Sequence, residues 1–315
     1  MAAHDKEQRM SRIGFIGLGI MGSPMAGHLV RAGHDVTGYT LNSAALEKLA
    51  AEGGTRASSV AEAVRDAEFV VTMLPNHPEV EEVTLGADGV FAHAPKGALV
   101  IDFSTIRPES SIAIAEAGAQ QGFGVLDAPV SGGQAGAEQG VLSIMVGGAE
   151  SDFTAATSVF EAVGSTYIHV GEHGAGQIVK AANQLVVGGT YALVAEAIVF
   201  MEALGVDPGK GLEVLAGGLA GSRILELKRA AMVAREFAPG FRIDLHHKDM
   251  GIVAAAARQA DIALPTGAVV ASLIAAGRAQ GYGALDHSAL LKVVENLNGR
   301  GANQPGPQHL SEGKQ

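Results

Sequence analysis

The sequence predicts an α/β fold: an N-terminal Rossmann-type, doubly wound sheet, a long inter-domain helix and an all-helical C-terminal domain. Three observations predict it. Short β-type runs alternate with amphipathic helical runs over the first half of the chain, a pattern typical of a parallel sheet covered by helices. A Gly-rich motif follows the first of these runs. After Gly174 the alternation stops, and only helical segments follow.

The first half contains short apolar runs, most of them followed by a segment with helical periodicity. Gly33 and the pair Gly53–Gly54 stand where helix C-caps belong, which supports the assigned boundaries. The predicted strands are 12–17, 35–39, 69–73, 99–102, 124–126, 143–146 and 166–169, and the predicted helices are 21–31, 44–52, 78–84, 108–121 and 151–163.

The second half begins with one long apolar helix, predicted over residues 177–204. At the usual rise per residue this helix would extend about 40 Å. Gly or Pro breaks separate the later predicted helices, at 210–216, 222–235, 245–259, 265–280 and 288–297. We therefore predict an NAD(P)-binding Rossmann domain at 11–173, a helical substrate and oligomerisation domain at 174–298, and disordered tails at 1–10 and 299–315.

Composition excludes several classes of function. The net charge is −11 and basic residues do not cluster, which disfavours nucleic acid and anionic membranes as partners. The absence of cysteine excludes disulfides and Cys-ligated zinc, and it fits a cytoplasmic location. No uninterrupted apolar run approaches the roughly 20 residues of a membrane span, and residues 1–10 are unlike a signal peptide. We expect a small-molecule carboxylate as the substrate.

Residues 17–22 match the G-x-G-x-x-G fingerprint of dinucleotide sites. In a chain with 43 glycines a chance match is plausible, but this one lies between a predicted strand and a predicted helix. Gly17 would permit the tight turn, Gly19 would let the backbone approach a pyrophosphate, and Gly22 would pack the helix on the strand. The helix N-terminus would face the phosphates. The predicted cofactor contacts here are Gly17, Leu18, Gly19, Ile20, Met21 and Gly22.

The end of the second predicted strand bears on the choice between NAD and NADP. An acid there favours NAD and a nearby Arg favours NADP, but residues 38–43 hold neither. Without a carboxylate nothing repels a 2′-phosphate, and Thr40 and Asn42 can donate hydrogen bonds to one. The residues therefore favour NADP and leave NAD usable. Other strand ends add the candidate contacts Leu74, Pro75, Asn76 and Thr105, although such residues also form turns and helix caps.

The segment 127–133 predicts a binding site for the substrate carboxylate. Ser131, Gly132 and Gly133 follow a predicted strand, and glycines leave backbone N–H groups uncovered. Consecutive N–H groups of this kind suit a carboxylate. An ordinary loop is the alternative.

Lys180, Asn183 and Gln184 share one face of the long helix by their spacing. An amine among Ala, Val and Leu costs desolvation energy, and the pKa of a lysine moves readily on burial. Lys180 can therefore protonate a carbonyl oxygen as hydride arrives, while Asn183 or Gln184 orients that oxygen. A lysine that extends along the helix to reach water is the alternative.

The segment His246–Asp249 carries two adjacent histidines. Adjacent residues on a helix point in different directions and no histidine follows at the spacing of one turn, so we predict no metal site. Lys248 is a candidate cation near cofactor or substrate, with a solvated Lys248–Asp249 pair as the alternative.

Four motifs in this order resemble the β-hydroxyacid dehydrogenase family, which includes 3-hydroxyisobutyrate dehydrogenase: Gly17–Gly22, Asp127–Gly133, Gly174–Asn183 and Lys248–Asp249. The resemblance covers about residues 11–298. Within the family the chain is most similar to the tartronate semialdehyde (2-hydroxy-3-oxopropionate) reductases, on residues 217–222, 239–246 and 286–290.

The resemblance implies that Lys180 is catalytic, with Asn183 beside the reacting oxygen. It implies that residues 131–133 hold the substrate carboxylate, that Thr105 and Lys248 contact the cofactor, and that the protein is a homodimer or homotetramer. We expect NAD(P)H-dependent reduction of a short 3-oxo acid, first of all tartronate semialdehyde to glycerate. A 3-hydroxyisobutyrate dehydrogenase, a succinic semialdehyde reductase and a non-catalytic dinucleotide sensor are the alternatives; in an imine-reducing relative we would expect Lys180 to be replaced.

Overall fold

A computed structural model describes residues 10–300 of the chain. The chain forms two compact units, one ending at Lys180 and the other beginning at Ala181. This border lies within a helix, whereas the sequence predicts a domain boundary just before that helix. The first unit is an α/β sheet, and the second is helical.

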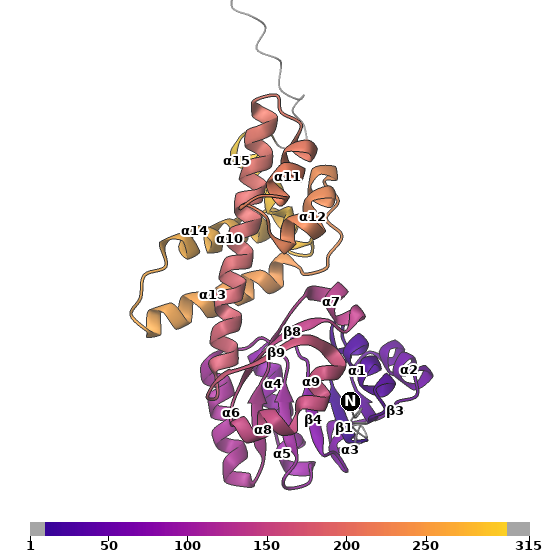
Figure 1. Ribbon diagram of the computed structural model, residues 1–315. Coiled ribbons are helices and arrows are strands. Elements are labelled where there is room, and N and C mark those ends of the chain that lie inside the picture. The colour runs from indigo at the N-terminus through magenta and orange to yellow at the C-terminus, as the bar shows by residue number, and fades with distance from the viewer. Residues whose placement is uncertain (1–9, 301–315) are drawn as a thin grey trace, which may run out of the picture. The chain divides into compact units, whose positions relative to one another are not determined.

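The first unit is built on a sheet with helices on both faces (Figure 1). In the part of the chain that the structure describes, the strand order is β3-β2-β1-β4-β5-β6-β8-β7, with β9 paired to β8. All neighbours from β3 to β6 are parallel, which confirms the predicted doubly wound sheet. The strands are β1 (Arg12–Ile16), β2 (Asp35–Tyr39), β3 (Thr55–Arg56), β4 (Phe69–Thr72), β5 (Leu99–Asp102), β6 (Gly124–Asp127), β7 (Val130–Ser131), β8 (Leu142–Gly147) and β9 (Gly164–Gly171).

One edge of the sheet departs from the predicted pattern. Strand β8 runs antiparallel to β6 and β7, and β9 then pairs parallel with β8. The two-residue strands β3 and β7 escaped prediction, because two residues do not show the alternation by which a strand is recognised.

Strand β1 shows why the sheet is covered on both faces. Ile13 and Phe15 pack into one hydrophobic cluster and Ile16 into another, on opposite sides of the strand. The covering helices are α1 (Gly22–Arg31), α2 (Ser43–Ala51), α3 (Val60–Val64), α4 (His77–Leu85), α5 (Val90–His93), α6 (Pro108–Gln121), α7 (Gly133–Gln139), α8 (Glu150–Ala155) and α9 (Thr157–Val163). The short helices α3, α5 and α7 were not predicted, and the helix predicted over 151–163 is divided at Ala156.

The long helix α10 (Ala175–Ala203) begins close to its predicted start. In the second unit it contributes Tyr191, Ala195 and Ile198 to one hydrophobic core. The other helices are α11 (Pro208–Ala216), α12 (Arg223–Ala234), α13 (Ile243–Gln259), α14 (Pro265–Gly277) and α15 (Leu290–Leu297), with a π-helical turn at 278–282 and a 3₁₀ turn at 287–289 (Figure 1).

Helix α10 is long and apolar enough to cross a membrane by length and composition alone. Its apolar run is interrupted by polar residues such as Asn183 and Gln184, in line with the expectation of no uninterrupted span, and 44% of its most apolar window is buried within the protein. The predicted tails lie almost entirely outside the described residues. Gly299 and Arg300, at the start of the second tail, are described, and the Arg300 backbone N–H donates to the carbonyl of Glu295 at 2.8 Å.

Candidate active site

The turn between β1 and α1 requires glycine at two positions. Gly17 has φ +100°, and its N–H donates to the carbonyl of Tyr39 at 2.9 Å. A Cβ on Gly17 would lie 2.3 Å from the carbonyl oxygen of Met73, and a Cβ on Gly22 would lie 1.9 Å from the oxygen of Gly17. Because neither distance is sterically possible, the chain itself demands these two glycines.

Gly19 is different, because within residues 10–300 no atom beyond its chain neighbours lies within 4 Å of a Cβ built on it. The space above it is therefore not required by the fold. No side chain caps the N-terminus of α1, and its first turn contains no acidic residue. An open backbone beside an uncapped helix N-terminus fits the pyrophosphate of a dinucleotide. Of the neighbours, Leu18 is buried in the core, Met21 is half-buried and Ile20 is exposed.

At the end of β2 the structure gives Asn42 a capping role. Its Oδ1 accepts a hydrogen bond from the N–H of Ala44 at 3.1 Å, at the start of α2. Thr40 is half-buried and Leu41 is 94% exposed.

Sequence reasoning missed a cation at this edge. Strand β3 pairs parallel with β2 so that Arg56 lies opposite Gly38, near the carboxyl end of β2. The Arg56 guanidinium forms an ion pair with Glu47 of α2. The signal was an arginine two residues after the cap position Gly54, inside a strand too short to be recognised.

The ends of β4 and β5 are joined by a buried carboxylate. Asp102 Oδ1 accepts hydrogen bonds from Thr72 Oγ1 at 2.7 Å and from the N–H of Ser104 at 3.0 Å, and Ser104 Oγ accepts from the N–H of Leu74 at 2.9 Å. Within residues 10–300, Asp102 Oδ2 is buried without a hydrogen-bond partner. Burial raises the pKa of Asp102 to about 6.

This carboxylate ties together two loops that carry predicted cofactor contacts. One holds Leu74, Pro75 and Asn76, and the other holds Thr105. Asn76 and Thr105 are half-buried, and Pro75 is exposed. Ser104 is buried and serves as a structural bridge between the loops.

Asp127 connects the predicted carboxylate-binding segment to the helix that carries Lys180. Its two oxygens accept from the N–H groups of Gly174 at 2.8 Å and Gln177 at 3.0 Å, at the start of α10. Burial raises the pKa of Asp127, against these hydrogen bonds. A Cβ on Gly176 would lie 2.6 Å from the Asp127 carbonyl oxygen, so the close approach needs glycine. The sequence indicates residues 127–133 as a motif, but it does not predict that Asp127 caps α10.

The segment that follows Asp127 presents two left-handed glycines. Ser131 ends β7, Gly132 has φ +138° and Gly133 has φ +62°. In the described part of the chain, no atom outside the neighbouring residues and the backbone of α7 lies within 4 Å of a Cβ built on Gly133. The backbone beside Gly133 is therefore open, as the carboxylate-binding prediction requires.

Lys180, the last residue of the first unit, is buried, with a relative exposure of 6%. The alternative of a lysine that extends to water is therefore wrong. Its helix is anchored one turn earlier, where Gln177 Nε2 donates to the Ser104 carbonyl at 2.8 Å and Gln177 Oε1 accepts from the N–H of Ile106 at 3.1 Å. Lys180 thus lies on a helix whose first turn is tied to two strand ends.

In the second unit Asn183 and Gln184 begin a polar network. Asn183 Nδ2 donates to Gln184 Oε1 at 2.8 Å, and Gln184 Nε2 donates to Asp249 Oδ2 at 2.6 Å. Lys248 Nζ lies 3.1 Å from Asp249 Oδ1. Sequence spacing had placed Asn183 and Gln184 on one helix face but had not linked them to α13.

The histidines of α13 have different surroundings. His246 is buried; its Nε2 lies 3.1 Å from the Gln184 carbonyl oxygen, and its Nδ1 lies 3.1 Å from His287 Nδ1. A Cβ on Gly188 would lie 3.1 Å from His246 Nε2, so a glycine admits the ring. His246 therefore packs α13 against α10, and His247 is half-buried.

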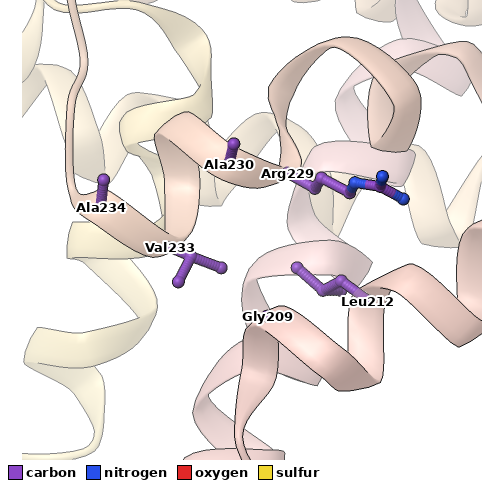
Figure 2. Close-up of a pocket in the computed structure, with 6 residues that line it drawn as sticks. All are labelled: Gly209, Leu212, Arg229, Ala230, Val233 and Ala234. Atoms are coloured by element: carbon purple, nitrogen blue, oxygen red, sulfur yellow. The ribbon is translucent and has the colours of Figure 1, made fainter.

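A groove in the second unit lies apart from these residues. Its volume is about 350 Å³, and it is lined from α11 and α12 (Figure 2). Its lining is mostly small or aliphatic, and it includes none of the predicted site residues: Gly209, Leu212, Arg229, Ala230, Val233 and Ala234.

Comparison with known proteins decides the family. Residues 12–171 match the NAD-binding domain of 6-phosphogluconate dehydrogenase, and residues 174–294 match the NAD-binding model of NADP-dependent 3-hydroxyisobutyrate dehydrogenase. The chain belongs to the 3-hydroxyisobutyrate dehydrogenase family of β-hydroxyacid dehydrogenases. It is therefore an NAD(P)-dependent oxidoreductase that acts on the hydroxyl group of a hydroxy acid.

Relatives within this family differ in substrate. The chain is 39% identical to the 2-hydroxy-3-oxopropionate reductase of Escherichia coli over 90% of its own length and 97% of the relative's. It is equally, 39%, identical to a 3-hydroxyisobutyrate dehydrogenase of Pseudomonas aeruginosa, over 84% and 91%. A solved structure of Mycobacterium tuberculosis 3-hydroxyisobutyrate dehydrogenase with L-serine has TM-score 0.82 and 34% identity, covering 91% of this chain and 99% of that one. Identity alone therefore does not select the substrate.

Proposed function

We propose that this dehydrogenase reduces a short 3-oxo acid, first of all tartronate semialdehyde to glycerate. The observation that carries the proposal is the burial of Lys180 on a helix that Asp127 caps. Asp127 itself lies four residues before Ser131 in the sequence. This arrangement ties a proton donor and the open backbone beside Gly133 to one scaffold within the first unit. A site that holds the substrate carboxylate and the substrate carbonyl a fixed distance apart selects 3-oxo acids over 2-oxo acids.

The residues have distinct roles in this proposal. A reduced nicotinamide, when bound, supplies the hydride to the aldehyde carbon. As the carbonyl π bond breaks, the Lys180 ammonium donates a proton to the oxygen, and the lysine amine regains a proton from solvent. The N–H groups at Gly132 and Gly133, with the Ser131 hydroxyl, hold the substrate carboxylate. Asn183 orients the reacting oxygen.

For the cofactor we propose a preference for NADP. The β2 edge contains no carboxylate between residues 38 and 43, and Arg56 adds a positive charge at that edge. Thr40 and the amide nitrogen of Asn42 remain candidate donors to a 2′-phosphate. The cofactor contacts of Gly17–Gly22, the Leu74–Asn76 loop, Thr105 and Lys248 stay predictions.

We also propose a homo-oligomer in the cytoplasm. Val186, Leu193 and Phe200 are exposed on α10 at intervals of seven residues, so they lie on one stripe of the helix. Exposed apolar stripes mark protein–protein contacts. Light scattering will give the number of subunits; a mass equal to the 32.0 kDa chain would contradict an oligomer.

Substrate ranking tests the function. Oxidation of NADPH or NADH will be followed with tartronate semialdehyde and succinic semialdehyde, and reduction of NADP⁺ or NAD⁺ with 3-hydroxyisobutyrate. We expect the highest kcat/KM for tartronate semialdehyde with NADPH. A higher kcat/KM for another of these acids would make that acid the preferred substrate. Absence of turnover on all of them would leave a dinucleotide sensor as the better description.

A further inference from the structure

The second unit contains a hydrogen-bonded row of polar side chains that links the buried Asp249 and Gln184 to the half-buried Asn183. Gln184 and Asp249 are both buried, and they lie 65 residues apart in sequence. The links are Asp249 to Gln184 at 2.6 Å and Gln184 to Asn183 at 2.8 Å. Buried polar groups are costly unless they are paired, so each link constrains the next.

The donors and acceptors in this row of hydrogen bonds run in one direction, which the Asp249 carboxylate sets. A side-chain amide has one accepting end and one donating end of nearly the same shape. An ionised carboxylate only accepts, and Asp249 lies beside the Lys248 ammonium, which balances its charge. Gln184 must therefore turn its nitrogen to Asp249, which leaves its oxygen toward Asn183. That oxygen can only accept, so Asn183 must turn its nitrogen to Gln184.

The consequence is a single orientation for the Asn183 amide. Its Oδ1 lies on the side turned away from Gln184, and the second hydrogen of Nδ2 has an equally determined position. If the amide rotated by half a turn, donor and acceptor would exchange places at the reacting oxygen. Lys180 lies three residues earlier on the same helix, so the orientation matters where the proton is transferred.

We propose that Asp249 and Gln184 are positioning residues that select the orientation of the Asn183 amide during hydride transfer. This assigns Gln184 an internal role in place of the substrate contact predicted from sequence. The backbone of Gln184 is held as well, by the contact of its carbonyl with His246 Nε2 at 3.1 Å. The proposal rests on the proposed function only in placing Asn183 beside the reacting oxygen.

Two variants and a control test this positioning role of Asp249 and Gln184. Asp249→Asn keeps the shape but lets residue 249 donate as well as accept, so both amide orientations become available. Gln184→Met removes the link at similar volume. Since one misdirected hydrogen bond costs roughly 1–3 kcal/mol, we expect kcat to fall about 10- to 100-fold in each variant. In Gln184→Met, substrate KM and the dissociation constant of the cofactor should stay within about twofold. Glu213→Gln, at an exposed position on α11, is the control and should leave kcat unchanged.

A double-mutant cycle separates positioning from general loosening. If Gln184 acts through Asn183, then Gln184→Met should change kcat little in an Asn183→Ala background. Additive losses in kcat, or an unchanged kcat in Asp249→Asn, would overturn the proposal. These kinetics use whichever β-hydroxy acid the protein turns over best, so a different substrate from tartronate semialdehyde leaves the test intact.

A second readout needs no turnover. The Asn183 side-chain amide can be identified in ¹H–¹⁵N spectra by its loss in Asn183→Asp. We expect one pair of signals in the wild type and shifted or doubled signals in Asp249→Asn, with the melting temperature close to that of the wild type. Unchanged Asn183 signals in Asp249→Asn would refute this positioning role even if the protein had no activity.

Discussion

The two units position their polar groups by different means. In the first unit, strand ends and glycines do it: Asp102 and Asp127 end the neighbouring strands β5 and β6 and receive backbone N–H groups. In the second unit, side chains on separate helices bind one another, as Gln184 binds Asp249. Parallel strands deliver their ends to one edge of a sheet, whereas helical periodicity gives a face but no partner.

The two units also contain buried carboxylates with opposite electrostatics. Asp102 has hydrogen bonds but burial dominates, and it raises the pKa to about 6. For Asp286 burial also acts to raise the pKa, but the charge of His287, hydrogen bonds from Ser288 and Gly240, and the Lys228 ammonium at 3.0 Å together outweigh it and lower the pKa to about 2. The same residue type therefore resists ionisation in one unit and favours it in the other.

The largest effect should come from Lys180→Met, which tests whether the first unit holds the proton donor. General acid catalysis contributes about 10²–10⁴-fold in rate, and we expect a loss of kcat in that range. Cofactor affinity should be retained; reduced-nicotinamide fluorescence will measure it, because the chain has no Trp. Residual turnover within tenfold of the wild type would contradict the role of Lys180.

The Gly-rich turn allows a paired comparison inside the first unit. Gly22→Ala places a methyl group 1.9 Å from the Gly17 oxygen, so we expect a loss of folding stability of about 1–3 kcal/mol or more. Gly19→Ala adds a methyl group where no protein atom lies within 4 Å, so the melting temperature should hold while NADPH affinity falls. Denaturant titration and fluorescence titration will separate the two. Equal losses of stability would show that Gly19 serves the fold and not the cofactor.

Asp102→Asn sharpens the electrostatic contrast. Because the folded pKa of Asp102 is about 6 against an ordinary value of 3.8, the folded state binds this proton more tightly. Its contribution to stability is fully present below pH 4 and is lost as pH rises to 6, a change of roughly 3 kcal/mol. The variant should lack this loss. Urea unfolding of both proteins at pH 4 and pH 7 will show how much the free energy of unfolding changes with pH in each. An equal change in the two proteins would contradict the prediction.

Asp286→Asn should show the opposite sign in the second unit. The folded pKa of about 2 lies below 3.8, so the contribution is present above pH 4 and is lost as pH falls toward 2. The loss is roughly 2 kcal/mol in the wild type and should vanish in the variant. Acid unfolding followed by circular dichroism measures it. An identical acid midpoint in both proteins would mean that Asp286 is not the responsible group.

The smallest effect concerns the β2 edge. Arg56→Gln removes a half-exposed cation that already pairs with Glu47, so its interaction with a 2′-phosphate should be worth only about 1 kcal/mol. We expect the ratio of NADPH to NADH affinity to fall about fivefold, by fluorescence titration. A fall in both affinities together would show that Arg56 does not discriminate the cofactors.

Sequence reasoning succeeded most where local geometry decides structure. The strands β1, β2, β4 and β5 were placed to within one residue, because each is an apolar run between turn residues. It failed for β3 and β7, which exist only because longer neighbours pair with them. In the site, the glycines and Lys180 were identified, but Arg56 was not, and Asp127 and Asp249 were noticed without their roles.

By itself the sequence determined the sheet, the Gly-rich turn, the long helix and the identity of the buried lysine, because each depends on residues close together in the chain. Only the tertiary structure decided that Asp127 caps α10, that Asp102 joins two loops and that Asp249 directs the amides of Gln184 and Asn183. Those contacts join residues 30 to 65 positions apart. A hydrogen bond at such a separation depends on how helices and strands pack together. The hydrophobic period of a single helix or strand does not specify that packing.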